Sequence, residues 1–429
     1  MKVFVIGGGG REHALVWKIS QSGLLSPNGL FCAPGNPGIA QYATCLSDLD
    51  ISNNQAVVKW CQNNAIGLVV VGPEVPLANG LADALKEAGI LCFGPTQDAA
   101  RVESSKIWSK NLMAKKRIST APWAFFSNAE EAKRYVQHYP NGQCVVKADG
   151  LCGGKGAIVC DILREAEEAI DLIMVRRKFG DAGKFVVIEK KFSGPELSIL
   201  AVTDGKHIVV LPPSQDHKRL LENDHGLNTG GMGAYSPVPI VTDELLQEII
   251  ETILRPAILG MEQEGCPYRG VLYAGLMLVG DEPKPVVIEF NCRFGDPETQ
   301  VVLPVINEDI LPLLVAAAEG NLSGDRIIPA SGNALCVVMA SNGYPGPYEI
   351  GKKITGLPEV IKEFDGRVIV FHAGTAEKNG ETITAGGRVF GVTGLGVDLN
   401  QAYARAYAAV LKIHLEGGAQ YRGDIGFRK

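Results

Sequence analysis

The chain has 429 residues, 46% of them hydrophobic and 21% charged, so it can bury a large core in roughly two to four globular domains. Its formal net charge of −6 leaves no basic footprint, which argues against nucleic acid as a partner. No apolar run reaches the ~18 residues of a membrane span, and Met1–Ile6 is too short for a signal peptide. We therefore expect a soluble cytoplasmic protein with no membrane partner.

Cysteine, histidine and glycine usage narrow the class further. The ten cysteines contain no CxxC pair and the seven histidines no HxxxH pair. This predicts buried reduced thiols and argues against a disulfide framework or a zinc site. The 51 glycines exceed an average usage of ~7% and gather at 7–10 and 150–156. Backbone approach to a ligand explains such runs better than disorder does.

The N-terminal segment predicts a phosphate site. An apolar strand, Val3–Ile6, leads into four glycines (7–10) and a helical pattern, and a helix N-terminus offers free N–H groups to an anion. The dinucleotide spacing GxGxxG fails, because Glu12 or His13 stands where its third glycine belongs. A small phosphorylated metabolite therefore fits better than NAD or FAD, with Arg11 as its charge partner. A purely structural tight turn is the alternative.

Strand and helix signals continue to alternate after this segment. Strands are predicted at 67–72 and 91–94 and a helix at 77–88, an order that indicates a parallel sheet with ligands at the carboxyl ends of its strands. Glu74 stands at such an end. It could accept a hydrogen bond from a sugar hydroxyl or cap the following turn, and both interpretations fit equally well.

The chain changes character after Thr96. A charged helical stretch at 99–116 carries Lys106, and a later strand ends at Lys147 before a glycine loop that contains Lys155. Lysine charge and close backbone N–H groups are what a triphosphate site needs, although the Walker pattern GxxxxGK[ST] is absent. The remaining elements predicted here are a linker at 118–123, helices at 129–138 and 163–176, and strands at 157–160 and 185–189.

Two further segments carry polar residues without regular periodicity. Glu189-Lys190-Lys191-Phe192 ends a strand whose exposed backbone could pair with an adenine edge, and Glu196 could bind ribose hydroxyls. Read alone, that segment is more simply a solvated charge run. The irregular span 214–239 favours a substrate loop, since long irregular stretches in compact proteins are functional or disordered. Its polar members are Asp216, Lys218, Arg219, Asn228 and Thr229. A long amphipathic helix capped by Thr242 is predicted to follow, at 242–264.

The stretch 286–300 predicts a metal site. Its apolar strand delivers Glu289 and Asn291 two residues apart, so both side chains project from one face. A carboxylate and an amide oxygen suit a hard cation such as Mg²⁺, whose other ligands would be waters and phosphate oxygens. Arg293 continues that face. Asp296 and Glu298 follow in a proline-containing turn, where they could touch substrate or only shape the turn. The alternative for the whole stretch is an ordinary strand end.

The last hundred residues predict a separate domain. Strands are expected at 333–340, 367–373 and 387–393, and a helix at 399–414. No catalytic constellation is visible among them. We interpret this part as a structural domain that can still contribute to the substrate cleft.

Several of these segments together resemble the ATP-grasp ligases, and most closely the glycinamide ribonucleotide synthetase family. The two most specific are Asn-Thr-Gly-Gly-Met-Gly-Ala-Tyr-Ser-Pro at 228–237 and Ile-Glu-Phe-Asn-Cys-Arg-Phe-Gly-Asp-Pro-Glu-Thr-Gln at 288–300. Shorter matches run from one end of the chain to the other, at 5–15, 33–36, 71–74, 147–151, 214–219 and 371–375.

The resemblance implies an α/β protein (α+β overall) with three domains and one reaction. An N-terminal parallel-sheet domain for the phosphoribosyl substrate (1–102) would precede an ATP-grasp domain (103–325), with a small lid subdomain at about 121–189, and a C-terminal mixed-sheet domain (326–429). ATP, glycine and 5-phosphoribosylamine would give glycinamide ribonucleotide, ADP and phosphate through glycyl phosphate, in de novo purine biosynthesis. Mg²⁺ or Mn²⁺ would be required, and we expect a monomer.

The same resemblance assigns roles to residues at matching positions. The nucleotide would be bound by Lys106 and Lys147 at the phosphates, Lys155 in the lid loop, Glu189 with the backbone of Lys190 and Phe192 at adenine, and Glu196 at the ribose. The metal ligands would be Glu289 and Asn291. The groups nearest the reacting atoms would be Arg293, Lys147, Asp216 and Lys218. The phosphoribosyl group and the cleft would be contacted by Gly8, Gly9, Gly10, Arg11, Glu74, Asn228 and Thr229.

The chain departs from the family pattern in three places. Glu189-Lys190 replaces two consecutive acids, Pro195 replaces a frequent acid beside Glu196, and the strand 272–279 lacks an acidic metal ligand. A backbone contact to adenine and the ribose ligand would survive the first two changes, whereas a second metal would need other ligands or water.

Two other functions are consistent with parts of the sequence. One is an ATP-grasp relative that carboxylates or formylates a later purine intermediate, which the start of the chain and the 228–237 segment disfavour. The other is a non-catalytic nucleotide-binding protein, which the complete set of Lys147, Glu289, Asn291 and Arg293 disfavours.

Overall fold

The computed structural model describes residues 1–427. Its N-terminal part is a five-stranded sheet in the order β3-β2-β1-β4-β5, and every strand pair in it is parallel, as predicted. The predicted helix 77–88 is wrong as a single element, because the left-handed Gly80 (φ 80°) separates two short helices. The elements are β1 (Val3–Gly7), α1 (Gly10–Ile19), β2 (Leu30–Pro34), β3 (Thr44–Cys45), α2 (Asn54–Asn64), β4 (Leu68–Val71), α3 (Glu74–Ala78), α4 (Leu81–Glu87) and β5 (Leu91–Phe93).

The predicted helical stretch 99–116 also divides, at Ser105. Its extended backbone (φ −138°, ψ 108°) ends α5 (Arg101–Ser104) and begins α6 (Lys106–Lys116). The Ser105 hydroxyl accepts a hydrogen bond from the Trp108 N–H, which satisfies one of the free donors at the start of α6. The break places Lys106 at the first helical position of α6.

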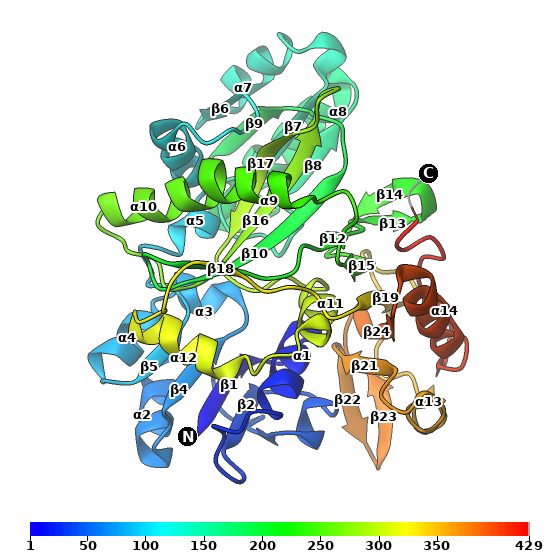
Figure 1. Cartoon of the computed structure of the whole chain (residues 1–429). Coiled ribbons are helices and arrows are strands. Elements are labelled where there is room, and N and C mark those ends of the chain that lie inside the picture. Colours follow the sequence, from blue (N-terminus) through cyan, green and yellow to red (C-terminus); the bar gives the residue numbers. More distant parts are fainter. Residues whose placement is uncertain (428–429) are drawn as a thin grey trace.

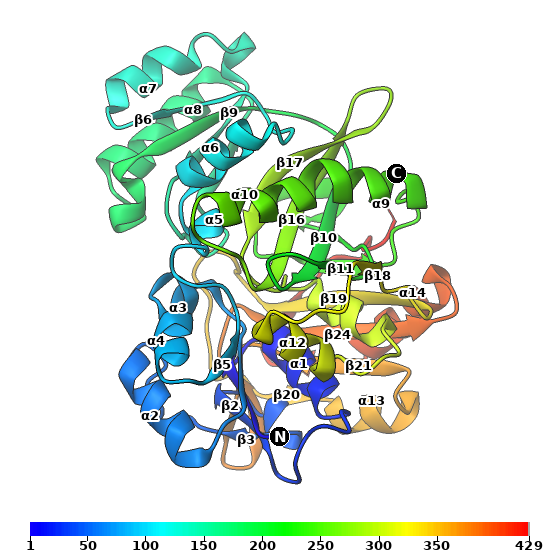
Figure 2. The ribbon, with the colours of Figure 1, turned by 60° about the vertical axis from the view of Figure 1, so that its left-hand side comes forward.

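The lid subdomain stands apart from the rest of the molecule (Figure 2). Its four strands form an antiparallel sheet in the order β6-β9-β7-β8. A hydrophobic cluster that includes Val146, Ile170 and Ile188 belongs to this subdomain alone. The lid subdomain therefore has a hydrophobic core of its own. Its elements are β6 (Trp123–Phe126), α7 (Ala129–Val136), β7 (Cys144–Ala148), β8 (Ala157–Cys160), α8 (Leu163–Ile170) and β9 (Val186–Lys190).

The central sheet, in the order β17-β16-β10-β11-β18, lies between the lid and the other two domains (Figure 1). The predicted helix 242–264 is confirmed in extent and in its cap, since the Thr242 hydroxyl accepts a hydrogen bond from the Leu245 N–H. A π-helical turn, Ile250–Leu254, joins its two halves. The elements are β10 (Glu196–Thr203), β11 (Ile208–Val210), α9 (Asp243–Ile249), α10 (Arg255–Gln263), β16 (Gly270–Val279), β17 (Lys284–Asn291), α11 (Thr299–Val302), α12 (Leu311–Glu319) and β18 (Arg326–Ile327).

The C-terminal sheet contains two strands from the span that the sequence left irregular. Its main path is β12-β15-β19-β24-β21, and β26 also pairs with β19. Residues 214–239 are therefore not a structureless loop: β12 and β15 complete this sheet, and β13 and β14 form a hairpin between them. The elements are β12 (Gln215–Asp216), β13 (Arg219–Leu221), β14 (His225–Asn228), β15 (Gly233–Ser236), β19 (Asn333–Ser341), β20 (Ile354–Thr355), α13 (Leu357–Phe364), β21 (Val368–His372), β22 (Thr375–Lys378), β23 (Glu381–Thr384), β24 (Arg388–Gly396), α14 (Leu399–Val410), β25 (His414–Leu415) and β26 (Ala419–Gln420).

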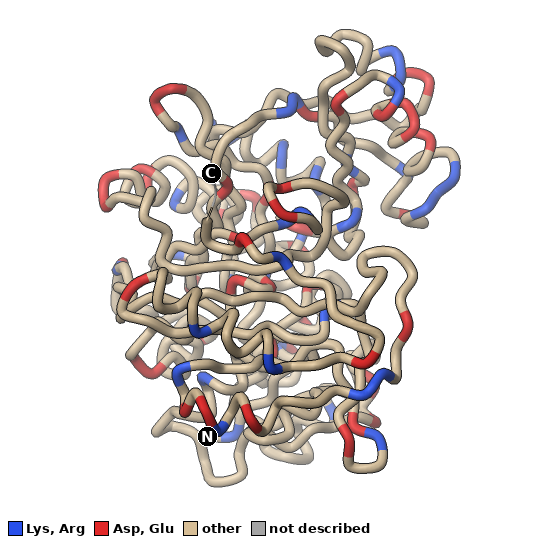
Figure 3. Tube along the Cα trace, turned by 90° about the vertical axis from the view of Figure 1, so that its right-hand side faces the viewer, with Lys and Arg blue, Asp and Glu red and all other residues tan. Residues whose placement is uncertain are grey.

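One hydrophobic cluster joins the three larger parts, since it includes Val69 of the N-terminal sheet, Ile253 beside the central sheet and Val392 of the C-terminal sheet. Acidic and basic residues are interspersed along the trace (Figure 3). Among residues 1–427, no helix is both long and apolar enough to cross a bilayer. All ten cysteines are free thiols, as expected.

Candidate active site

The two predicted metal ligands lie at the end of β17, in strongly cationic surroundings. Burial alone would raise the pKa of Glu289, but Lys218, Lys147 and Lys106 nearby hold it below its usual value. The Asn291 side-chain oxygen accepts a hydrogen bond from Arg293 Nη2 at 3.2 Å. Glu289 is therefore ionised at neutral pH. Its carboxylate and the Asn291 oxygen are hard donors too few to enclose a cation, so they fit Mg²⁺ or Mn²⁺ that takes further oxygens from phosphate and water.

Arg293 is held by carboxylates from two other segments. Its Nε lies 3.2 Å from Glu74 at the start of α3, and its Nη2 lies 3.1 Å from Glu103 in α5. The other Glu103 oxygen accepts a hydrogen bond from the Cys292 N–H at 2.7 Å. The Glu74 and Glu103 carboxylates together hold the guanidinium beside Asn291, on the face of β17. Glu103 was missed by the sequence reasoning, because nothing local marks a contact between residues 189 positions apart.

The Glu189 carboxylate is paired with two buried lysines in this structure. It lies 2.9 Å from Lys147 Nζ and 3.0 Å from Lys110 Nζ, and all three side chains are buried. Lys147 also donates to the carbonyl of Ile288, beside the metal face. Burial lowers the pKa of Lys110 to about 8, although the nearby Glu189 carboxylate acts to raise it. Lys110, unmarked in the sequence, thus helps to orient Lys147.

The backbone of Lys190 and Phe192, after Glu189, was predicted to contact adenine. The Lys190 N–H donates to the carbonyl of Pro122, so it is already satisfied in this conformation. Glu196, at the first position of β10, lies 3.1 Å from Lys218 Nζ. Burial would lower the pKa of Lys218, but Asp216 and Glu196 hold it well above its usual value. Glu196, Asp216 and Lys218 therefore lie together, although the resemblance implied separate roles for them.

The glycine loop of the lid subdomain, residues 150–156, is hydrogen-bonded to α6 near its start and is exposed to solvent farther along. Lys106 Nζ donates to the carbonyl of Gly150 at 3.1 Å, and an Asp149 oxygen accepts from the Ile107 N–H at 2.8 Å. Lys155, farther along the loop, is exposed. Gly154 beside it adopts φ +75° with open space around it. Lys106 and Lys147 thus belong to the central cluster, whereas Lys155 stands outside it.

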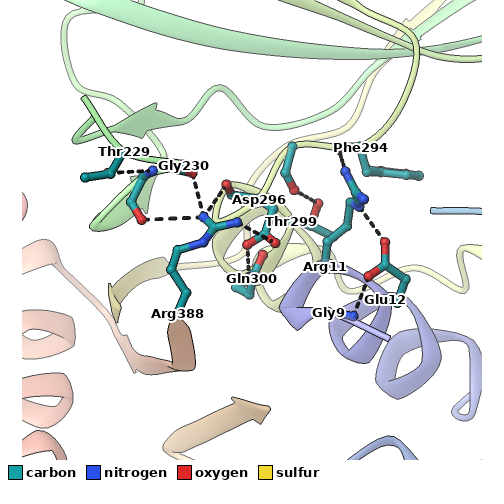
Figure 4. A network of polar contacts seen from close by, with 12 residues as sticks. Gly9, Arg11, Glu12, Thr229, Gly230, Phe294, Asp296, Thr299, Gln300 and Arg388 are labelled. Carbon is teal, nitrogen blue, oxygen red and sulfur yellow. Dashed lines mark hydrogen bonds and ion pairs between the residues drawn. The ribbon is translucent and has the colours of Figure 1, made fainter. Parts of the chain in front are cut away.

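The N-terminal glycine loop faces the turn that follows β17 (Figure 4). Glu12 accepts hydrogen bonds at 2.7 Å from both the Gly9 N–H and Arg11 Nε. Arg11 Nη1 then donates to the carbonyl of Phe294 at 3.0 Å. Gly8 packs so closely that a Cβ there would lie 2.6 Å from the carbonyl oxygen of Gly35. Arg11 therefore holds the glycine loop against this turn through its hydrogen bonds to Glu12 and Phe294.

The remaining predicted residues lie in the β13–β14 hairpin and in the turn after β17. Thr229 donates its hydroxyl to the carbonyl of Lys218 at 2.9 Å, which closes the base of the β13–β14 hairpin. Asn228 ends β14 opposite Arg219. Glu298 is buried and accepts hydrogen bonds from Ser198 and Tyr273, so this carboxylate shapes the turn.

The arrangement suits phosphoryl transfer better than acid–base or nucleophilic catalysis. Lysines 106, 147 and 218 and Arg293 surround one ionised carboxylate at the point where the lid, the central sheet and the N-terminal sheet meet. No cluster of three or more histidine, cysteine or acidic residues with metal-ligating geometry occurs within residues 1–427. Positioning and charge neutralisation are the main requirements of phosphoryl transfer.

Comparison with known proteins agrees with this geometry. Family models of phosphoribosylglycinamide synthetase match in chain order: the N domain at residues 1–103, the ATP-grasp (A) domain at 104–299 and the C domain at 334–428. A chloroplastic phosphoribosylamine–glycine ligase of Arabidopsis thaliana is 49% identical over 97% of this chain and 78% of its own length. The phosphoribosylamine–glycine ligase of Rhodopirellula baltica is 46% identical over 99% of this chain and 96% of its own.

Solved structures give the same result. The crystal structure of phosphoribosylamine–glycine ligase from Thermotoga maritima superposes with a TM-score of 0.84 at 33% identity, covering 99% of this chain and all of that one. At this coverage the match includes all three larger parts and the lid subdomain. On the residues matched and the identity over nearly the whole length, the chain belongs to the phosphoribosylglycinamide synthetase family.

Proposed function

We propose that this protein joins glycine to 5-phosphoribosylamine at the expense of ATP, giving glycinamide ribonucleotide, ADP and phosphate in de novo purine biosynthesis. The observation that carries the proposal is the cluster of Glu289, Asn291, Arg293 and Lys147 at the end of β17, in a chain of this family. The N-terminal glycine loop lies against the turn that follows this cluster. Two substrates could therefore meet there.

The reaction would proceed in two steps. A carboxylate oxygen of glycine attacks the γ-phosphorus of ATP while the bond to the β–γ bridging oxygen breaks, which releases ADP and leaves glycyl phosphate. The amine nitrogen of phosphoribosylamine then attacks the carbonyl carbon. Phosphate leaves with the former carboxylate oxygen, and the nitrogen gives up a proton. Arg293 would stabilise the charge on the acyl phosphate and on its tetrahedral successor.

The remaining residues would divide between nucleotide and phosphoribosyl substrate. We assign the ATP phosphates to Lys106 and Lys147, with Lys155 joining them when the lid closes, and the ribose to Glu196. Glu189 would act on the nucleotide through Lys147, while the backbone at Lys190 and Phe192 would lie along adenine. The phosphoribosyl side and the cleft would comprise Gly8, Gly9, Gly10, Arg11, Glu74, Asp216, Lys218, Asn228 and Thr229.

The bound metal ion would be held by Glu289 and Asn291 and would supply positive charge at the transferred phosphate. We assign the phosphoribosyl substrate to residues 1–102, ATP to 103–325 with a lid at about 121–189, and closure of the cleft to 326–429. We further propose a monomer in the cytoplasm, where ten free thiols would remain reduced.

The proposed function is tested by measuring whether ADP release requires glycine. We expect ADP release only when glycine and freshly prepared phosphoribosylamine are both present. With glycine labelled by ¹⁸O in its carboxylate, one labelled oxygen should appear in the product phosphate, measured by mass spectrometry. Replacement of glycine by bicarbonate or formate as the required substrate would disprove the proposal. Unlabelled phosphate from an active enzyme would rule out the acyl-phosphate route alone.

Lys110→Met tests the role of the buried lysine pair in ATP binding. We expect the KM for ATP to rise about tenfold, which corresponds to ~1.4 kcal/mol, because Glu189 would lose one of the two lysines that fix it and would shift Lys147. Lys115→Met is the matched control on the same helix, since Lys115 pairs with Glu264 at the surface. Steady-state kinetics at saturating glycine measure both. An unchanged KM for ATP would make Lys110 purely structural.

A further inference from the structure

Arg388, the first residue of β24 in the C-terminal domain, reaches the Gly230 backbone and the turn after β17 (Figure 4). Its Nη1 donates to the carbonyl of Gly230 at 2.5 Å and to the carbonyl of Asp296 at 2.8 Å. Its Nη2 lies 3.0 Å from the Asp296 carboxylate. The planar guanidinium meets the two carbonyls with one nitrogen and the carboxylate with another, so the single ammonium nitrogen of a lysine cannot replace it in full.

The two segments that Arg388 joins also touch each other directly. Gly231 has φ +108°, and a Cβ at this position would lie 2.5 Å from Pro297 Cδ. The Gly230 N–H donates to the hydroxyl of Tyr344, another residue of the C-terminal domain. The end of the β13–β14 segment and the turn after β17 are therefore packed together, and the C-terminal domain holds both.

The same network continues to the N-terminal glycine loop. The second Asp296 oxygen accepts a hydrogen bond from Gln300 Nε2 at 2.7 Å. That amide packs on Gly10, where a Cβ would lie 2.6 Å from Gln300 Nε2, and a Cβ on Gly9 would lie 3.8 Å from Asp296. Arg388 thus connects, through Asp296 and Gln300, to the glycines that we assign to the phosphoribosyl group.

The side-chain contacts of Arg388 separate it from the residues that we assign to the nucleotide. Burial would raise the pKa of Asp296, but Arg388 and Arg11 hold it below its usual value, so the carboxylate is ionised. Within residues 1–427, the hydrogen bonds and ion pairs of the Arg388 side chain reach only Gly230, Gly231 and Asp296. None of them reaches the lysines that we assign to ATP.

We propose that Arg388 is a positioning residue for phosphoribosylamine, through which the C-terminal domain aligns the Asp296 turn and the Gly230–Gly231 backbone with the N-terminal glycine loop. The inference rests on the proposed function. Arg388 need not touch any substrate. It sets the distance between the amine and the acyl carbon in the second step, and it leaves ATP binding alone.

The test compares Arg388→Lys and Arg388→Gln with the wild-type enzyme. We expect kcat/KM for phosphoribosylamine to fall by about 10²-fold in Arg388→Gln, the cost of misplacing a reacting group by about 1 Å. Arg388→Lys keeps a charge beside Asp296 and should recover part of this loss. The KM for ATP and MgATP binding by calorimetry should stay within about twofold of wild type in both variants, because a misaligned acceptor leaves the nucleotide contacts in place.

Arg367→Gln is the matched control, since Arg367 is an exposed arginine of the same domain that donates to the backbone carbonyls of Glu363 and Phe364. It should leave the kinetics unchanged. If Arg388→Gln does not fold, Arg388→Lys decides. Equal losses for ATP and phosphoribosylamine, no loss for either, or loss of the melting transition in both variants would overturn the inference. A wild-type enzyme without glycine-dependent ADP release would overturn the proposed function itself, and the inference with it.

Discussion

Glu289→Ala is expected to abolish turnover, with kcat/KM at least about 10³-fold below wild type. The charge that a bound metal contributes to phosphoryl transfer is worth several kcal/mol, and this variant removes the only ionised carboxylate that we assign to the metal. Asn291, a neutral donor, would hold the cation weakly by itself. Calorimetric titration of Mn²⁺ in the presence of ADP should show the corresponding loss of metal affinity.

A control at the other end of the same strand pair separates metal binding from a general effect of charge. Glu282 is exposed in the turn between β16 and β17. Glu282→Ala should keep wild-type turnover and Mn²⁺ affinity. Activity close to wild type in Glu289→Ala at low Mg²⁺ would refute the metal assignment, whatever the stability of the variant.

Arg293→Met is expected to lose both activity and stability. Removing a donor that stabilises charge on the acyl phosphate should lower kcat by about 10²–10³-fold. The variant also leaves Glu74 and Glu103 without their shared partner, and breaking a mostly buried ion pair from one side costs about 3–5 kcal/mol. Differential scanning calorimetry and steady-state kinetics measure the two losses separately.

The pH dependence of stability gives this prediction a second signature. Burial already raises the pKa of Glu103, and without Arg293 the pKa of Glu74 should rise as well, because burial would be less opposed. A carboxyl whose folded-state pKa lies above its unfolded value favours the folded state only while protonated. The free energy of unfolding of the variant should therefore fall, relative to wild type, as pH rises above about 4.5.

Arg255→Met is the comparison, because Arg255 also bridges two acids, Glu251 and Asp325, but at a more exposed site away from the cleft. It should lose little stability and no activity. If Arg293→Met is destabilised equally at pH 5 and pH 8, the two carboxylates do not take up protons in the folded state, and Arg293 is not what keeps them ionised.

How far the sequence could be interpreted depended on whether a signal was local. The strand 286–291 and the cap at Thr242 follow from side-chain alternation and capping chemistry within a few residues, and both are present. β12 and β15 are two and four residues long, too short to show a period, so 214–239 seemed irregular. β15 is a strand because it pairs with β19, about a hundred residues farther along the chain, and β12 is a strand because it pairs with β15.

Residues of the candidate site also differ in whether a local pattern could predict them. Glu289 and Asn291 could be predicted as a pair because strand geometry alone brings them to one face. Glu103, Lys110 and Arg388 could not, because each acts through a tertiary contact to a residue predicted on other grounds. The break at Ser105 was hidden for a related reason, since α5 has only four residues and is too short to show a period of its own.

The insertion of β12 and β15 into the C-terminal sheet has a consequence for building chimaeras. The chain leaves the central sheet, contributes two strands to a sheet whose other members begin at Asn333, and then returns. Near the end of the chain, Arg422 donates to the carbonyl of Arg219 and pairs with Asp224 in the same excursion. A C-terminal segment exchanged between two family members would therefore need to bring residues 214–237 with it. A chain truncated near residue 330 would keep β12 but lack β19, the other partner strand of β15.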